Sequence, residues 1–80
     1  MSVSLTKRAE KDLEQLPEAL QEKARALINK LETEPALGKK LVGPLAGLRS
    51  IRLGRTHRII YEDKPQLTVL TIPMRRDAYR

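Results

Sequence analysis

The apolar residues of this chain follow one spacing before Pro35 and a different one after it. Before Pro35 they recur every three or four residues, a spacing that predicts helices with one buried side. These residues are Ala9, Leu13, Leu16, Leu20, Ala24, Leu27, Ile28 and Leu31. After Pro35, short runs rich in β-branched residues predict strands. Residues 1–80 are therefore expected to form a single α+β domain.

Single residues predict where the first elements begin. Val3 and Leu5 alternate with serines, which is typical of a short strand. Thr6 can cap a helix that begins at Lys7, because its side-chain oxygen can accept from a free N–H group of the first turn. Pro17 is tolerated at the first position of a helix, so it is predicted to open a second one.

The second helix is expected to end at Glu34–Pro35, because the residue before a proline disfavours helical geometry. Residues 35–47 contain three of the four glycines and two prolines, which indicates a loop. Apolar side chains are expected to pin this loop to the core, and they are Leu41, Val42 and Leu45.

Three segments with strand character follow, at residues 48–53, 57–62 and 66–72. From residue 49 to residue 58, arginines recur at every third position, a spacing that would also suit one face of a helix. They are Arg49, Arg52, Arg55 and Arg58. Gly54, the neighbouring β-branched residues and the lack of an N-cap favour strands.

We therefore expect two N-terminal helices packed on one face of a small, mainly antiparallel sheet of about four strands. Alternation along the strand places Ser50 and Arg52 on one face, opposite Ile51. Arg49 has the parity of Ile51 but is expected to bend to solvent at the strand edge. By the same rule His57 points toward the core. The sheet face without helices would carry arginines.

Charge changes sign at the same point in the chain. Residues 1–34 carry six Lys or Arg against seven Asp or Glu, a net charge of −1. Residues 35–80 carry ten against three, a net charge of +7, which completes the +6 of the whole chain. A near-neutral half joined to a strongly basic one indicates a scaffold that presents an anion-binding face, and the obvious large anion is nucleic acid.

Several classes of protein are excluded by composition. The chain has no cysteine, so it has neither disulfides nor thiolate metal sites. Its carboxylates show no metal-ligand spacing, and no metal or cofactor is expected. No apolar run approaches the ~18 residues of a membrane span, and the N-terminus lacks the apolar core of a signal peptide. A cytoplasmic location is expected.

Taken in order, six segments resemble the RelE/ParE toxin superfamily over about 75 residues. They are Ala9-x-x-x-Leu13-x-x-Leu16-Pro17, Leu31…Pro35, Gly38-Lys39-Lys40-Leu41-x-Gly43-x-Leu45, Leu48-Arg49-x-Ile51-Arg52-Leu53-Gly54, His57-Arg58-Ile59-Ile60-Tyr61 and Arg75-Arg76-Asp77-x-Tyr79. RelE-like members are mRNA interferases that cut the message in the ribosomal A site, whereas ParE-like members inhibit DNA gyrase. The resemblance also implies a cognate antitoxin that wraps the toxin in a hetero-oligomer.

Four residues receive catalytic roles from this resemblance. Arg52 matches a basic residue of the RelE-like catalytic strand, and Arg58 matches the arginine of the Arg-x-x-Tyr segment. Arg75 matches the arginine of the C-terminal motif, and Tyr79 matches the functional tyrosine. RNA contacts are predicted for five further cations, which are Lys39, Lys40, Arg49, Arg55 and Arg76.

The chain departs from the RelE-like pattern at two positions. Ser50 stands where a lysine is frequent, and Met74 stands where histidine or lysine is frequent. Both positions bear on proton transfer, so RNA binding is better supported than the catalytic rate. Tyr79 is a candidate general base, but it could instead stack on a nucleobase or orient the ribose 2′-hydroxyl.

Metal-free RNA cleavage uses the ribose 2′-hydroxyl as nucleophile, so the protein must mainly align it and stabilise the phosphorane. We assign Arg58 and Arg75 to the scissile phosphate and Arg52 to the adjoining backbone. The competing interpretation is that these arginines pair with acids, which are Glu62, Asp63 and Asp77. A ribosome-dependent endoribonuclease, a gyrase inhibitor and an inactive RNA-binding module remain the three candidate functions. In each, an acidic or amphipathic antitoxin segment would cover the basic face.

Overall fold

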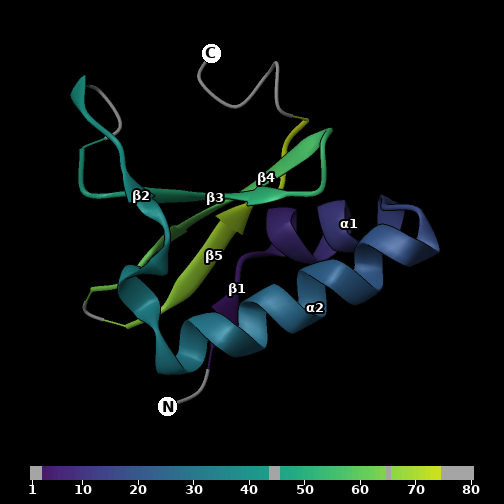
Figure 1. Cartoon of the computed structure of the whole chain (residues 1–80), viewed down its shortest axis with the longest axis horizontal. Helices are drawn as coiled ribbons and strands as arrows, with labels where there is room; N and C mark the ends of the chain where they lie inside the picture. The colour runs from purple at the N-terminus through teal and green to yellow at the C-terminus, as the bar shows by residue number, and fades with distance from the viewer. Residues whose placement is uncertain (1–2, 44–45, 65, 75–80) are drawn as a thin grey trace.

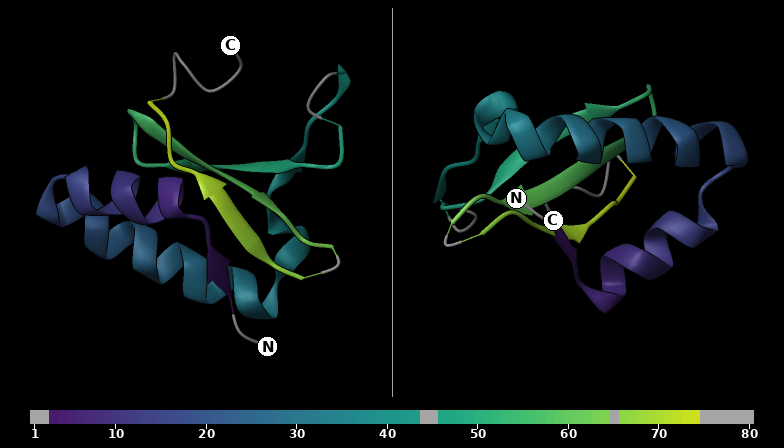
Figure 2. Two further views of the ribbon diagram at one scale, coloured as in Figure 1. Left: turned by 180° about the vertical axis from the view of Figure 1, so that it is seen from behind. Right: turned by 90° about the horizontal axis from the view of Figure 1, so that it is seen from below.

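A computed structural model describes residues 3–43, 46–64 and 66–74 of the chain. Its elements are β1 (Ser4–Leu5), α1 (Lys7–Gln15), α2 (Glu18–Thr33), the 3-10 helix η1 (Pro35–Leu37), β2 (Lys39–Lys40), β3 (Arg49–Leu53), β4 (His57–Glu62) and β5 (Thr68–Thr71). The strands form one sheet in the order β1-β5-β4-β3-β2, in which only the β1–β5 pair is parallel. Both helices lie on one side of this sheet (Figures 1 and 2), which confirms the α+β prediction.

Both helices begin where the sequence predicted, to within one residue. The Thr6 hydroxyl accepts a hydrogen bond from the Ala9 N–H (3.1 Å) and donates one to the Leu70 carbonyl (2.6 Å), which ties the start of α1 to β5. The Pro17 carbonyl accepts from the Gln21 N–H (2.9 Å) just before α2. Neither described helix has the length and apolar character needed to cross a membrane.

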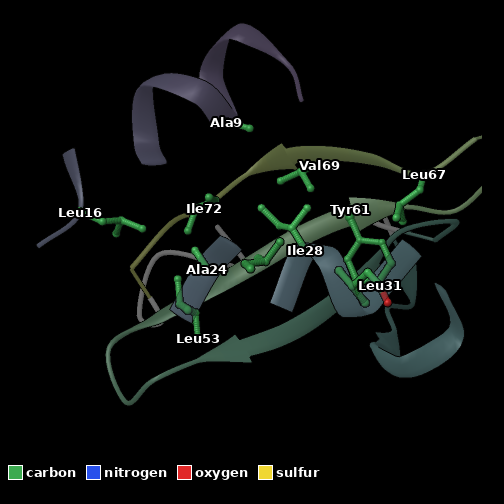
Figure 3. Packing of buried hydrophobic residues seen from close by; sticks show 11 residues of the cluster. Ala9, Leu16, Ala24, Ile28, Leu31, Leu53, Tyr61, Leu67, Val69 and Ile72 are labelled. Carbon is green, nitrogen blue, oxygen red and sulfur yellow. The ribbon is translucent and has the colours of Figure 1, made fainter. Parts of the chain in front are cut away.

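The core lies between the helices and the sheet and contains the predicted apolar stripe (Figure 3). Its buried residues are Ala9, Leu16, Ala24, Ile28, Leu31, Leu53, Ile59, Tyr61, Leu67, Val69 and Ile72. Leu13, Leu20 and Leu27 of the stripe are partly buried against this cluster. Because the chain has no Phe or Trp, Tyr61 is the largest side chain in this core.

The Tyr61 hydroxyl joins the sheet to the segment that follows α2. It accepts from the Gly38 N–H (2.7 Å) and donates to the Pro35 carbonyl (2.9 Å). A Cβ atom at residue 38 would run into the Tyr61 ring and hydroxyl, so only glycine allows this approach. Burial raises the pKa of Tyr61 above its ordinary value of 10.0, and the Gly38 hydrogen bond opposes this shift.

The sheet has five strands because part of the predicted loop pairs with β3. Lys39 lies opposite Ser50 and Lys40 lies opposite Arg49, and the Leu41 N–H donates to the Leu48 carbonyl (3.0 Å). A pair of lysines shows no apolar alternation, so the sequence gives no signal for this strand.

The expectation that Val42 pins this segment to the core is wrong, because the residue is 85% exposed. Leu41 is half-buried. Leu45 lies outside the described residues.

Asp12 fixes the end of β5, a role that the sequence analysis missed. Its carboxylate accepts from the Thr71 hydroxyl (2.8 Å) and from the Ile72 N–H (3.0 Å), and its other oxygen accepts from Arg8 Nε (3.2 Å). This anchoring joins α1 to the strand that leads into Pro73 and Met74, the last residues that the structure describes.

Candidate anion-binding face of the sheet

The helices cover one face of the sheet, and alternation along β3 and β4 assigns residues to the other. Leu53, Ile59 and Tyr61 point into the core with no exposed surface, so their strand neighbours point away from it. Directly opposed residues share a face. We call this second surface the basic face, formed by Lys39, Ser50, Arg52, Arg58 and Ile60. The prediction that Ser50 and Arg52 share a face opposite Ile51 is confirmed.

Two arginines stand side by side on the basic face. Arg52 of β3 lies directly opposite Arg58 of β4. Like charges at directly opposed positions destabilise a strand pair, and arginine cannot lose its charge at ordinary pH. Arg52 is exposed, and no acid of the described residues lies within ion-pair distance of it. An anion bound between the two side chains would relieve their repulsion.

The Arg58 side chain reaches across the face to Ser50. Its Nη1 donates to the Ser50 hydroxyl (3.3 Å), and its Nε is buried. Ser50 itself is only 2% exposed. The small serine side chain at this position therefore leaves room for the Arg58 guanidinium.

The two lysines of β2, both predicted to contact RNA, point to opposite faces of the sheet. Both are exposed. Lys39 shares the basic face with Ser50, whereas Lys40 lies opposite Arg49 on the helix side. Arg55 is exposed in the turn between β3 and β4. The structure therefore brings Lys39, Arg52 and Arg58 onto one surface.

Arg49 has a structural role, and the expectation that it bends to solvent is wrong. Its side chain is only 16% exposed. Its Nε donates to the Asp63 carboxylate (3.1 Å), and its Nη1 donates to the carbonyls of Gly38 (2.9 Å) and Ala36 (3.4 Å). Strand parity also assigns Arg49 to the helix side of the sheet, where these carbonyls lie.

The predicted orientation of His57 is confirmed. It lies on the helix side and lines a cleft of about 290 Å³ with Arg8, Asp12 and Met74, among others. Its Nδ1 is 2.7 Å from the Thr56 hydroxyl. The imidazole is therefore separated by the sheet from the paired arginines.

Residues 3–79 match the family model of the ParE toxin of type II toxin-antitoxin systems, parDE. The chain belongs to this toxin family. Its fold is similar to that of a YoeB/ParE toxin from Agrobacterium tumefaciens, with 27% identity and a TM-score of 0.79 over 92% of this chain and 98% of that one. No curated protein matches the toxin.

Two toxin-antitoxin complexes also contain a similar chain. The RelBE2 complex from Mycobacterium tuberculosis matches at 30% identity and a TM-score of 0.78, over 95% of the toxin and 92% of that chain. The RelE-RelB complex from Pyrococcus horikoshii matches at 27% identity and a TM-score of 0.72, over 95% and 96%.

Three predicted site residues of the toxin, Arg75, Arg76 and Tyr79, lie outside the described residues, and their roles stay predictions. The described chain nevertheless ends close to the paired arginines. The Arg58 N–H donates to the Pro73 carbonyl (3.0 Å), and Met74 forms a bridge with His57.

Proposed function

We propose that this toxin is a ribosome-dependent mRNA endoribonuclease that uses the ribose 2′-hydroxyl as nucleophile and needs no metal. The observation that carries the proposal is the Arg52–Arg58 pair on the sheet face that the helices leave uncovered. Like charges at directly opposed positions destabilise a strand pair, and a phosphodiester bound between these two side chains would offset that effect. Lys39 extends the same surface by one strand.

In this mechanism Arg58 and Arg75 bind the scissile phosphate, and Arg52 binds the adjoining backbone. Guanidinium groups hold two phosphate oxygens at once and stabilise the charge that develops on the phosphorane. The sheet holds the strands that carry Arg52 and Arg58 in fixed register, which suits a site that must align its substrate. Tyr79 removes the proton of the 2′-hydroxyl, orients that group or stacks on a base.

We propose a cognate antitoxin as the protein partner. The structures from Mycobacterium tuberculosis and Pyrococcus horikoshii are toxin-antitoxin complexes, which supports this partnership. An acidic or amphipathic segment would complement the net charge of +7 in residues 35–80. Covering the basic face would exclude both the ribosome and mRNA, the proposed cytoplasmic targets.

Translation with purified ribosomes tests the activity. We expect the wild-type toxin to cut messages within codons, with cleavage mapped by primer extension. Arg58→Ala should lose most of this cleavage, whereas Arg25→Ala, which removes an exposed arginine from α2, should retain it. Intact messages with wild-type toxin, or equal cleavage by Arg58→Ala, would contradict the proposal.

The family description favours gyrase inhibition as a second candidate, because the matching model is that of the ParE toxin. A gyrase inhibitor would block supercoiling in a purified assay and would cause broken DNA and an SOS response in cells, without cutting messages. A third candidate, an RNA-binding module without activity, would leave growth unchanged. Expression of the chain with each readout separates the three.

A further inference from the structure

Ser50 lies beneath the guanidinium of Arg58 on the basic face. The two residues are diagonal neighbours, because Ser50 is paired with Ile60, two positions from Arg58. Diagonal positions are about 7–8 Å apart in an antiparallel pair, a distance that an arginine side chain can span. The bond from Nη1 to the serine hydroxyl (3.3 Å) shows that it does so.

This bond draws the Arg58 guanidinium away from Arg52. Ser50 precedes Arg52 by two residues on β3, a separation of about 6–7 Å along the strand. Since Arg52 is directly opposite Arg58, the two charged groups would otherwise extend from neighbouring points of the sheet. A guanidinium held toward Ser50 and the exposed one of Arg52 would then approach a bound anion from different sides.

The position also disfavours a long side chain. Ser50 is 2% exposed and the Arg58 Nε is buried, so little space remains above residue 50 for a chain as long as that of lysine. A lysine there would compete for that space and place another positive charge beside the guanidinium. An alanine would leave the space but remove the oxygen that accepts from Nη1.

We propose that Ser50 is a positioning residue that orients Arg58 for binding a phosphate group. Ser50 acts through the guanidinium and does not touch the substrate. The identification of the bound phosphate as that of RNA rests on the proposed function, whereas the orientation of Arg58 does not.

Nuclear magnetic resonance of the intact toxin tests this role with inorganic phosphate as the probe. The Arg58 guanidinium signals are identified by their loss in Arg58→Lys. In the wild type we expect slow rotation about the Nε–Cζ bond and shifts of these signals on phosphate addition. Ser50→Ala should speed the rotation and weaken phosphate binding by about three- to tenfold, the effect of one typical intramolecular hydrogen bond.

Two further variants separate positioning from a general effect on the fold. Ser50→Thr keeps the hydroxyl and should restore slow rotation and phosphate affinity to within about twofold of wild type. Thr68→Ala removes a strand hydroxyl that donates to the Gln66 carbonyl (3.5 Å), and it should leave both readouts unchanged. Loss of phosphate binding in Ser50→Ala without rescue by Ser50→Thr would overturn the proposal.

The proposal that Ser50 positions Arg58 would also be overturned if Ser50→Ala left two quantities unchanged. These are the rate of rotation about the Arg58 Nε–Cζ bond and the affinity for phosphate. These measurements do not depend on RNA cleavage. If wild-type toxin leaves messages intact but binds phosphate in a manner that depends on Ser50, the positioning role stands and the endoribonuclease proposal fails.

Discussion

Arg52 and Arg58 face each other directly across β3 and β4, on the sheet face that carries no helix. Like charges at directly opposed positions destabilise a strand pair in general. A bound anion would offset this repulsion, which connects the register of β3 and β4 to the proposed site.

Replacing Arg52 by glutamine should therefore leave the free energy of unfolding unchanged or raise it by up to about 1 kcal/mol. The same variant should bind RNA more weakly, because it lacks one of the two guanidiniums. Urea denaturation and RNA titration measure the two effects. If Arg52→Gln lost more stability than the control Arg25→Gln on α2, Arg52 would be shown to stabilise the fold.

Lys39 and Lys40 provide a matched pair for mapping the RNA surface. Both are exposed neighbours on β2, but only Lys39 lies on the basic face. Lys39→Gln should reduce the slope of log affinity against log salt concentration by about 0.7, the value for one phosphate contact with single-stranded RNA. Lys40→Gln should leave the slope unchanged. Equal effects of the two substitutions would place the RNA elsewhere.

The close approach of Gly38 to Tyr61 predicts a non-additive pair of substitutions. Gly38→Ala should destabilise the protein by about 1–3 kcal/mol, because the new methyl group meets the tyrosine ring and hydroxyl. Tyr61→Phe should cost about 1–3 kcal/mol, since the Pro35 carbonyl and the Gly38 N–H lose their shared partner. The double variant should cost less than the sum, because the hydroxyl is removed from the clash. Additive losses in urea denaturation would contradict this geometry.

The raised pKa of Tyr61 predicts a loss of stability at alkaline pH. Burial is the main cause of the shift, so the neutral phenol is favoured in the folded state. The folded protein then holds this proton at pH values where the unfolded chain has released it. The stability difference between wild type and Tyr61→Phe should be constant below about pH 10 and should decrease as the pH rises further. A difference that stays constant up to pH ~11 would contradict the shift.

The hydrogen bonds to Asp12 predict that this residue of α1 stabilises the end of β5. Asp12→Ala should destabilise the protein by about 1–3 kcal/mol, because the Thr71 hydroxyl and the Ile72 N–H both lose their acceptor. Glu14→Ala, an exposed acid on the same helix, is the control and should have little effect. Amide hydrogen exchange should locate the loosened region at Ile72. Equal protection of Ile72 in both variants would show that the anchor is dispensable.

Local patterns in the sequence determined the elements and their buried sides. Thr6 and Pro17 predicted where the helices begin, because capping and proline geometry depend only on nearby backbone. The alternation in β3 predicted that Ser50 and Arg52 lie opposite Ile51, since successive strand side chains point to opposite faces. The charge difference between the two halves indicated a basic surface, though not which cations compose it.

Contacts between distant segments were decided by the tertiary structure alone. Arg49 is mostly buried in an ion pair with Asp63. Asp12 accepts a hydrogen bond from Thr71, which lies about sixty positions away in the sequence. Lys39–Lys40 form a strand because they pair with β3. Each of these contacts depends on packing that brings remote segments within a few ångströms, whereas propensity and spacing describe only neighbours along the chain. The sequence therefore determined which surfaces the elements bury, and the folded sheet decided which charged side chains meet.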